Sequence, residues 1–447
     1  MLSLKKDNNS KKSSRLKLKE HQKKIIEYFD KNDHLDRVFL FHSIGSGKTI
    51  SSLSLAYFYK IKGNNKNKIL IACPVSLIEN FKKEINKLKL DENQFELITY
   101  KRLTNILVNE NNYLKDRIVI FDEIHNYRNP NKTTSLLVNS AFNAYKVIML
   151  SATPIINFQN DFATVVAILN KVSYSKAQFN LNNPNFLKNR ISCYSMSKDE
   201  LTKFFPRTKK HLIKIEMTQE YYIQYMNVEM NETDKLPANY KDKDYTAFLN
   251  GLRRSSNKIH EISPKYQWIL EHYLSNPQKT LIYSFWKDSG IEIIRDILNK
   301  AKISNEIIDG SLSAKQRENI IEKYNENKIK VLLITSAASE GINLKETRQV
   351  IVLEPHWNNE KLNQVVGRAI RYNSHKDLTE SKKQVDVYYL LLVKPKVKLI
   401  NYILNPFKII EKTSIDEIMY NLSNSKEKLA EEYLEKLKKY CIENKKI

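Results

Sequence analysis

The chain has 447 residues, of which 41% are hydrophobic and 28% are charged, and this composition favours folded domains over a disordered chain. Its net charge of +24 suits a polyanionic partner such as nucleic acid, although AT-rich coding DNA also enriches a protein in lysine. The longest hydrophobic run, at residues 387–393, is far shorter than the ~20 residues of a membrane-spanning helix. An integral membrane protein is therefore excluded, and we expect no membrane partner.

The three cysteines, Cys73, Cys193 and Cys441, are far apart in the sequence and form no CxxC pair. We therefore expect neither a disulfide framework nor a four-cysteine zinc site. The N-terminal residues are polar and lysine-rich, without the hydrophobic centre of a secretory signal. These features predict an intracellular, cytoplasmic protein with reduced thiols.

Residues 1–17 form a basic, low-complexity segment that we expect to be a mobile tail. Between residues 18 and 170, short hydrophobic runs alternate with helical patterns. The runs that we expect to form strands are residues 38–41, 69–72, 95–99, 118–121 and 147–150. This alternation predicts an α/β domain with a doubly wound parallel sheet.

The alternation stops in residues 171–262, an Asn- and Lys-rich linker or insert segment. Its one clear element is a strand at residues 211–217, after which Thr218 is expected to cap a helix that ends at Gln224. A second doubly wound domain is predicted for residues 263–400. Its expected strands are residues 281–285, 306–308, 331–335, 350–353 and 387–393.

Residues 401–447 are expected to form a C-terminal helical segment. Hydrophobic residues recur at helical spacing within residues 425–444, and they are Leu429, Tyr433, Leu437 and Tyr440. Charged residues fill the other positions, so we expect an amphipathic helix that packs on the second domain.

The strand at residues 38–41 runs into the sequence HSIGSGKT, and a helical pattern follows. A strand, a glycine-rich turn and a helix N-terminus in this order are typical of a loop that binds phosphate groups through backbone N–H groups. Lys48 is expected to reach the β- and γ-phosphates of ATP, and Thr49 to ligate Mg²⁺. The other residues predicted to bind the nucleotide are Ser43, Ile44, Gly45, Ser46 and Gly47.

The strand at residues 118–121 ends in Asp122 and Glu123, within the sequence DEIH. Asp122 is expected to hold Mg²⁺, and Glu123 to orient and deprotonate the attacking water. Two carboxylates can also mark a solvated strand end, but the phosphate-loop pattern upstream favours catalysis. The hydroxyls of Ser151 and Thr153, in the sequence SATP after the next strand, are expected to reach these carboxylates.

In the second half, the sequence QVVGRAIR places Gln364, Arg368 and Arg371 at positions i, i+4 and i+7, on one side of a helix. Two guanidinium groups aimed at one place suit a triphosphate, although a pair of surface arginines is the alternative. Gly341, in the sequence SEGINL after the strand at residues 331–335, is expected to approach the nucleotide and the nucleic-acid backbone.

The ordered set GSGKT, CPVSLIENF, DEIH, SATP, SEGINL and QVVGRAIR resembles the motor core of superfamily 2 helicases and translocases. The CPVSLIENF sequence, Asn157 and the strand-to-helix element around Met217 resemble the Swi/Snf-type branch. His42-Ser43, residues 126–129 and residues 371–375 resemble nucleoside triphosphatase I and the small subunit of the early transcription factor of large cytoplasmic DNA viruses. Related proteins occur on yeast cytoplasmic linear plasmids.

The resemblance implies two RecA-like domains with ATP and Mg²⁺ in the cleft between them. Gln22 matches the glutamine that reads adenine in this superfamily, with a solvated helix residue as the alternative. Ser336 and the segment near Pro74 would face the nucleic-acid backbone. The catalytic residues implied are Lys48, Asp122, Glu123, Gln364, Arg368 and Arg371.

The function that this resemblance implies is a nucleic-acid-stimulated ATPase that translocates on DNA in viral-type transcription. DNA is favoured over RNA as the track, and the implied partner is a viral-type RNA polymerase or a second transcription-factor subunit. The implied location is the cytoplasm, or the virion if the chain is viral. Two alternatives stay open: a strand-separating RNA or DNA helicase, and an ATP-binding initiation-factor subunit without motor activity.

Overall fold

The computed structural model describes residues 18–43, 45–181, 184–233, 249–259, 263–336, 342–395 and 413–444. The chain forms two compact units. The first contains residues 1–155, 159–195 and 433–447, and the second contains residues 156–158 and 196–432. The expected tail at residues 1–17, and the site residues Ile44 and Gly341, lie outside the described residues.

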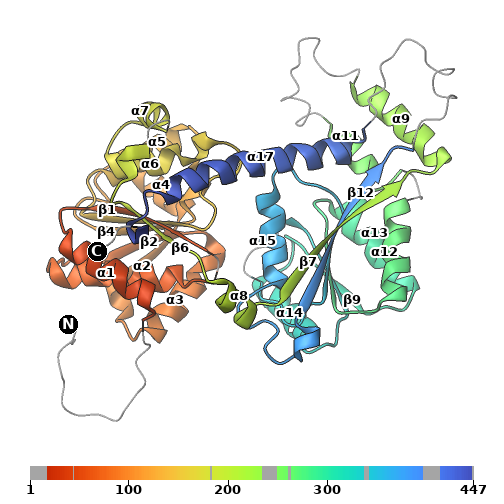
Figure 1. Cartoon of the computed structure of the whole chain (residues 1–447), viewed down its shortest axis with the longest axis horizontal. Helices are drawn as coiled ribbons and strands as arrows, with labels where there is room; N and C mark the ends of the chain where they lie inside the picture. The colour runs from red at the N-terminus through yellow and green to blue at the C-terminus, as the bar shows by residue number, and fades with distance from the viewer. Residues whose placement is uncertain are drawn as a thin grey trace. The chain divides into compact units, whose positions relative to one another are not determined.

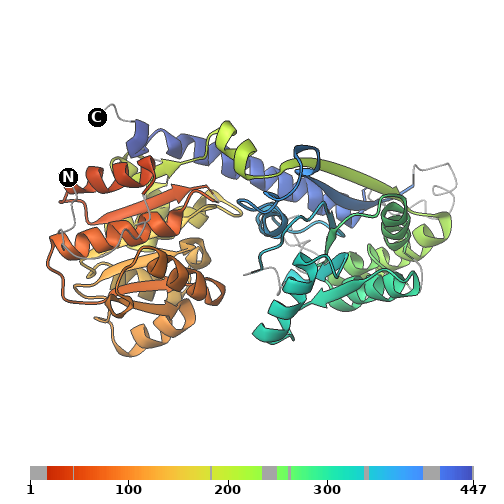
Figure 2. The same cartoon turned by 90° about the horizontal axis from the view of Figure 1, so that it is seen from below.

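The first unit is built on a six-stranded, all-parallel sheet with the order β3-β2-β4-β5-β1-β6. Its strands are β1 (Arg37–His42), β2 (Ile69–Cys73), β3 (Phe95–Thr99), β4 (Ile118–Asp122), β5 (Lys146–Ser151) and β6 (Ile191–Tyr194). Helices cover both faces of this sheet (Figures 1 and 2). One face carries α1 (Glu20–Lys31), α2 (Lys48–Lys62) and α3 (Ile78–Lys87), and the other carries α4 (Tyr100–Asn109), α5 (Lys132–Ala141) and α6 (Ala163–Asn170), with α7 (Tyr174–Asn180) packed on α6.

The second unit has its own six-stranded parallel sheet, with the order β7-β12-β11-β8-β10-β9. Its strands are β7 (Arg207–Glu216), β8 (Thr280–Tyr283), β9 (Asn305–Ile308), β10 (Val331–Ile334), β11 (Gln349–Val352) and β12 (Gln384–Val393). Alternate side chains along a strand point to opposite faces. Leu281 of β8 therefore packs with α14 (Ala314–Asn325) and α15 (Asn359–Ala369), and Ile282 packs with α12 (Pro264–Ser275) and α13 (Glu292–Lys300).

The predicted α/β architecture of two doubly wound parallel sheets is confirmed. The strand expected at residues 211–217 is β7, which starts earlier because it pairs with β12 along its whole length. Thr218 caps the helix after it, since Tyr221 N donates to Thr218 Oγ1 at 3.2 Å. That helix, α9 (Gln219–Thr233), continues past the predicted end at Gln224. The remaining helices of the second unit are α8 (Lys198–Phe204), α11 (Asn250–Ser255) and most of α17 (Ile415–Lys438).

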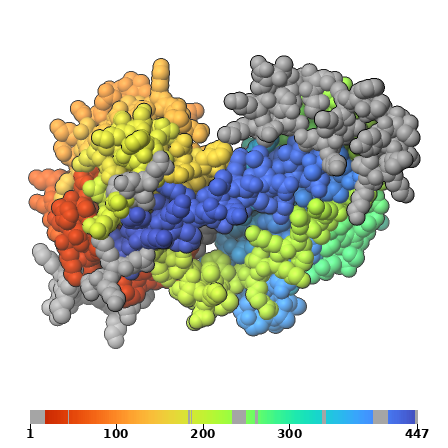
Figure 3. All heavy atoms as spheres, turned by 45° about the horizontal axis from the view of Figure 1, so that its top comes forward, coloured from red at the N-terminus to blue at the C-terminus, as the bar shows by residue number. Residues whose placement is uncertain are grey.

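The expected helix at residues 425–444 corresponds to α17, which begins and ends earlier than predicted. It lies at the molecular surface (Figure 3), and Leu429 is 58% exposed although it was expected to be buried. Residues from Tyr433 onward belong to the first unit, where Tyr433 Oη donates to Leu181 O at 3.1 Å and its ring faces that of Phe162. The expectation that this segment packs on the second domain therefore holds up to residue 432 and is wrong for the residues from Tyr433 onward.

The first turn of α17 is fastened to the second unit by a buried ion pair. Lys265 Nζ lies 2.6 Å from Asp416 Oδ2, and the two side chains are 0% and 3% exposed. Burying two charges is costly unless the remaining hydrogen-bonding groups are satisfied. Lys265 also donates to Leu353 O at 2.8 Å, and Asp416 Oδ2 accepts from Leu392 N at 2.9 Å. The pair thus joins the helix to the ends of two strands.

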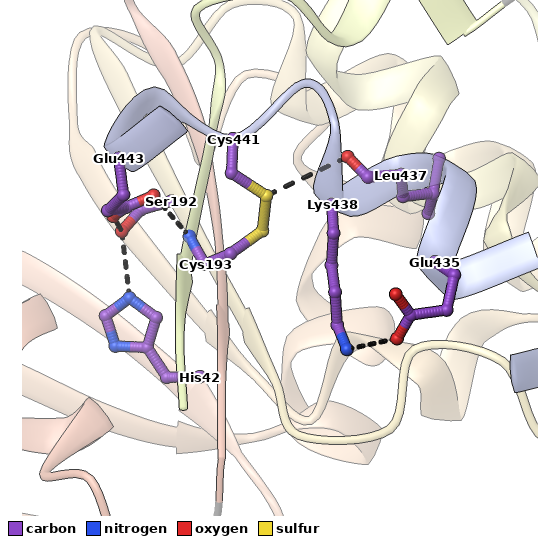
Figure 4. Close-up of a disulfide and its surroundings, with 8 residues drawn as sticks. All are labelled: His42, Ser192, Cys193, Glu435, Leu437, Lys438, Cys441 and Glu443. Atoms are coloured by element: carbon purple, nitrogen blue, oxygen red, sulfur yellow. Dashed lines mark hydrogen bonds and ion pairs between the residues drawn. A yellow bond between two sulfur atoms is a disulfide. The ribbon is translucent and has the colours of Figure 1, made fainter. Parts of the chain in front are cut away.

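Cys193 and Cys441 form a disulfide with a Cα–Cα distance of 5.5 Å, although 248 positions separate them in the sequence (Figure 4). The expectation of no disulfide is therefore wrong, because separation along a chain does not limit proximity in the fold. Cys73 is buried and unpaired. Among the described helices, none is both long and apolar enough to cross a membrane.

Strand β6, which was not predicted, forms the edge of the first sheet beside β1. His42, the last residue of β1, is 0% exposed, and its Nε2 lies 2.9 Å from Ser192 Oγ on β6. Burial, together with the charges of His21 and Lys48, lowers the pKa of His42 to about 3. The ring is therefore neutral in the folded protein at every pH near neutrality.

We predict that this neutral histidine makes the first unit lose stability in acid. Between pH 6.5 and about 3, the unfolded chain binds a proton at this position and the folded chain does not, so stability falls as the pH decreases. The loss for one such group is about 1.4 kcal/mol per pH unit. Urea unfolding at pH 7, 6 and 5, followed by hydrogen exchange of the β1 amides, should show a shallower pH dependence for His42→Gln than for the wild type.

All three tryptophans lie in the second unit, so their fluorescence provides the control. Its pH dependence should be the same in the two proteins. Parallel loss of first-unit stability in wild type and variant would show that His42 does not titrate as described.

Candidate active site

The loop between β1 and α2 has a backbone that only glycine adopts easily. Gly45 has φ 79° and Gly47, the residue before the helix, has φ 88°. A Cβ atom on Gly47 would also lie 2.8 Å from Gln22 Nε2. Lys48 begins α2, and its Nζ donates to His42 O at 3.2 Å. The lysine therefore reaches back across the loop toward the strand that precedes it.

Helix α1 supports this loop from one side. Gln22 is 3% exposed, and its Nε2 donates to Gly47 O at 3.3 Å while its Oε1 accepts from Lys19 N at 2.9 Å. His21 Nε2 lies 3.2 Å from Ser46 O. Gln22 is thus a buried contact of the loop and not a solvated helix residue. Adenine recognition by Gln22 stays a prediction.

The two carboxylates of the DEIH sequence follow directly from β4. Asp122 is 6% exposed, its carbonyl accepts from Tyr100 Oη at 2.6 Å, and its Oδ1 accepts from Glu123 N at 3.0 Å. Glu123 has φ 53° and ψ 50°, a left-handed conformation that is costly for a residue with a side chain. This left-handed turn follows directly after the last residue of β4.

The carboxylate of Glu123 is held by two neighbours. Its Oε2 lies 3.2 Å from His125 Nδ1 and accepts from Ser151 Oγ at 3.3 Å, and these two partners are themselves 2.9 Å apart. The expected contact between the SATP sequence and these carboxylates is confirmed for Ser151. The role of His125 was not predicted. The sequence did offer one indication of it, because His125 belongs to the same DEIH motif as Glu123.

Burial and the adjacent charge of Glu123 raise the pKa of Asp122, while the charge of Lys48 acts in the opposite direction. Burial also acts to raise the pKa of Glu123, but the hydrogen bond from His125 and the charge of Lys48 hold it below its usual range. Glu123 is therefore an ionised, oriented acceptor for a proton. Asp122 is a buried carboxylate that a bound cation would stabilise.

These residues fit Mg²⁺. The ion is commonly bound by one or two protein oxygens together with phosphates and water, and it does not need a dedicated cage. Asp122 offers a carboxylate, and Thr49 offers a hydroxyl on the first turn of α2. Within the described ranges, no group of three or more His, Cys, Asp or Glu side chains could hold a metal by itself. When bound, the ion would neutralise charge on phosphate oxygens.

In the second unit, Gln364 and Arg368 lie on α15, where Gln364 Nε2 donates to Glu360 Oε1 at 3.0 Å. Arg371 does not continue this helix, contrary to the prediction. Helix α15 ends at Ala369, and Ile370 has the non-helical angles φ −109° and ψ 83°.

A local turn follows the helix, because Ser374 Oγ accepts from Arg371 N at 3.2 Å and donates to Arg371 O at 2.8 Å. Burial, followed by the charge of Arg368, lowers the pKa of Arg371 to about 10, so the two arginines still interact electrostatically. Leu344 N donates to Arg368 O at 3.3 Å, which connects the SEGINL sequence to the arginine helix.

Known proteins match both halves of this arrangement. Residues 15–156 match the family described as "Type III restriction enzyme, res subunit", and residues 264–373 match "Helicase conserved C-terminal domain". A protein of Acanthamoeba polyphaga mimivirus that is named as an ATP-dependent RNA helicase is 34% identical over 459 residues, covering 96% of this chain and 98% of that protein.

Two further relatives are proteins of other viruses. Nucleoside triphosphatase I of Melanoplus sanguinipes entomopoxvirus is 23% identical, over 84% of this chain and 73% of that protein. A "Termination factor NPH-I homolog" of African swine fever virus is 23% identical, over 91% of this chain and 76% of that protein. The chain belongs to the superfamily 2 helicases, among the relatives of viral nucleoside triphosphatase I, and it is an ATP hydrolase.

Proposed function

We propose that the protein is a nucleic-acid-stimulated ATPase that translocates on DNA during viral-type transcription. The observation that supports the catalytic assignment is the carboxylate of Glu123, which His125 and Ser151 hold in place and whose ionised form the hydrogen bond from His125 and the charge of Lys48 favour. Glu123 orients the attacking water and accepts its proton, while His125 and Ser151 fix the direction of the carboxylate. Lys48 leaves His42 O to neutralise charge on the transferred phosphoryl group. Thr49 and Asp122 hold Mg²⁺.

Two arginines of the second unit are also assigned to catalysis. Arg368 and Arg371 are neighbouring cations, and repulsion between them is relieved when a polyanion binds. We assign to them the neutralisation of charge that develops in the transition state, with Gln364, which lies on the helix of Arg368, in a supporting role.

The assignment to DNA and to transcription is supported by charge and by the relatives. A net charge of +24 favours a nucleic-acid track. Two relatives from DNA viruses are named as a nucleoside triphosphatase and a termination factor, which supports a partner such as a viral-type RNA polymerase or a second transcription-factor subunit. A cytoplasmic location, or packaging in a virion, accords with this role.

The alternative is a strand-separating helicase on RNA or DNA, and the name of the mimivirus relative favours it. Two assays distinguish these functions. A DNA translocase displaces a third strand from duplex DNA in an ATP-dependent manner, whereas a helicase separates a tailed RNA or DNA duplex. A subunit that only binds ATP would do neither, and the oriented carboxylate of Glu123 argues against that function.

We predict that Glu123→Gln binds ATP with nearly normal affinity but turns over roughly 10²–10⁴-fold more slowly, because the amide cannot accept the proton from water. Lys48→Ala should abolish hydrolysis, because the loop contains no other cationic side chain. For both variants, phosphate release measures turnover, and equilibrium nucleotide binding measures the affinity for ATP. Loss of nucleotide binding in Glu123→Gln would assign this residue a structural role.

We also predict that nucleic acid stimulates hydrolysis and that the stimulation falls as salt rises, since phosphate contacts release counterions. The measurement is the ATPase rate against duplex DNA, single-stranded DNA and RNA at several salt concentrations. The strongest stimulation should come from duplex DNA. If none of the three nucleic acids stimulates hydrolysis, the excess of lysine is better explained by AT-rich coding DNA than by nucleic-acid binding.

Arg371→Lys should reduce turnover sharply while the affinity for ATP stays within a few-fold. Arginines that act on transferring phosphoryl groups contribute about 10³–10⁵ in rate, and lysine lacks the planar fork of donors. Arg295→Lys is a matched control on α13, where the side chain is exposed. Normal turnover in Arg371→Lys, or a loss explained by a lower melting temperature, would contradict this role.

A further inference from the structure

The segment at residues 441–443 lies along the outer edge of β6 (Figure 4). The disulfide joins Cys441 to Cys193, and Glu443 Oε2 accepts from Cys193 N at 2.8 Å. An edge strand exposes backbone N–H groups that no neighbouring strand can satisfy. Glu443 supplies that acceptor and also accepts from Ser192 Oγ, so the disulfide and two hydrogen bonds cover the outer edge of a four-residue strand whose other edge pairs with β1.

A chain of hydrogen bonds leads from this contact to the phosphate loop. Ser192 Oγ donates to Glu443 Oε1, and His42 Nε2 lies 2.9 Å from the same hydroxyl. Because the single hydroxyl proton goes to the carboxylate, the His42 ring must donate from Nε2. The carbonyl of His42 accepts in turn from Lys48 Nζ. Glu443 is thus connected to the lysine of the loop through two side chains and one carbonyl group.

A second route runs through the last residue of β6. Tyr194 O accepts from Ser43 N at 2.9 Å, at the start of the loop. The Tyr194 ring stacks on that of His21, with centroids 3.6 Å apart and an interplanar angle of 9°. His21 in turn contacts Ser46 O. The loop is therefore attached to β6 at both its beginning and its middle.

We propose that Cys441 and Glu443 are positioning residues for the phosphate loop, and that the redox state of the Cys193–Cys441 pair sets the affinity for ATP. This rests on the function proposed above for Lys48 and its loop. With the C-terminal contacts released, β6 loses its edge acceptor, and the loop adopts the binding geometry for only part of the time. Apparent affinity falls by that fraction, whereas turnover of the bound nucleotide changes less, because bound phosphates order the loop.

The redox step is ordinary thiol–disulfide exchange. A dithiol such as dithiothreitol transfers two electrons and two protons to the disulfide. The sulfur–sulfur bond breaks, Cys193 and Cys441 become thiols, and the reagent leaves as a cyclic disulfide. Removal of the reagent and mild oxidation reverse the step.

The test measures KM for ATP and kcat separately for the oxidised and the reduced wild type. The same measurements are made on Cys441→Ser and Glu443→Ala, and Lys48→Ala is assayed for any hydrolysis of ATP. Glu435→Ala is the matched control, because Glu435 is an exposed ion-pair partner of Lys438 on the same C-terminal segment (Figure 4). Hydrogen exchange of the peptide at residues 42–49 reports on the loop directly.

We expect reduction to raise KM roughly tenfold, as for a loop that is competent one-tenth of the time, with kcat changed less than about twofold. The rise should reverse on reoxidation and appear without reductant in Cys441→Ser, which should be insensitive to dithiothreitol. Glu443→Ala keeps the disulfide and should also raise KM and speed exchange at residues 42–49. Glu443→Ala therefore tests the positioning role even if Cys441→Ser or the reduced protein unfolds. The control Glu435→Ala should have the same KM, kcat and hydrogen exchange as the wild type.

Unchanged KM and unchanged exchange at residues 42–49 in reduced wild type and Glu443→Ala, with Lys48→Ala inactive, would overturn this inference and leave the proposed site intact. An active Lys48→Ala would instead overturn the site. If kcat instead fell in the reduced protein, Cys441→Ser and Glu443→Ala in proportion to a fall in melting temperature, the C-terminal contact would serve only stability. That result would also overturn the inference.

Discussion

Parallel pairing of β1, β5 and β4 is the constraint on which the first unit's chemistry depends. Phe41 is opposite Ser151 and Asp122 is opposite Leu150, so the three strands end at the same edge of the sheet. Parallel strands also need long crossover connections, and here the crossovers are the helices that fill both faces. A shift of one residue in this register would turn the side chain of Asp122 to the other face of the sheet.

The two units treat buried charge differently. In the ion pair of Lys265 and Asp416, main-chain groups satisfy further hydrogen-bonding capacity of both side chains. This pair therefore holds the start of α17 in one position. Lys48, by contrast, contacts only a carbonyl, and among the described residues no carboxylate lies within ion-pair distance of it. Burial and the charge of Glu123 raise the pKa of Asp122, so its ionised form is disfavoured until a cation binds. The groups assigned to catalysis are thus those with electrostatic capacity left for a ligand.

Most of the fold could be predicted because the signals are local. Strand–helix alternation is visible in residues 18–170 and again in residues 263–400, and the phosphate loop and the DEIH sequence each follow a hydrophobic strand. Strand β6 was not predicted because its four residues, Ile-Ser-Cys-Tyr, lack a hydrophobic run and because its contacts, with β1 on one edge and Glu443 on the other, are distant in the sequence. Arg371 was misplaced for a related reason. Its spacing fits a helix, but Ser374 closes a turn that ends the helix first.

The disulfide and the packing of Tyr433 were also beyond prediction, because both depend on which distant segments the fold brings together. Neither leaves a pattern in the sequence around it. The role of His125 could have been inferred, since it lies two residues from Glu123, but hydrogen-bond partners follow from the turn geometry and not from the spacing.

The first unit is assembled from segments on both sides of the second unit in the sequence. A protein truncated after Ser195 would retain every motif of the phosphate loop and the DEIH site, yet it would lack the residues that cover the edge of β6. Its exposed edge would then be a template for pairing with other chains, which favours aggregation. The first unit is therefore better isolated as a circularly permuted chain, in which residues 433–444 are joined ahead of residue 18, than as an N-terminal fragment.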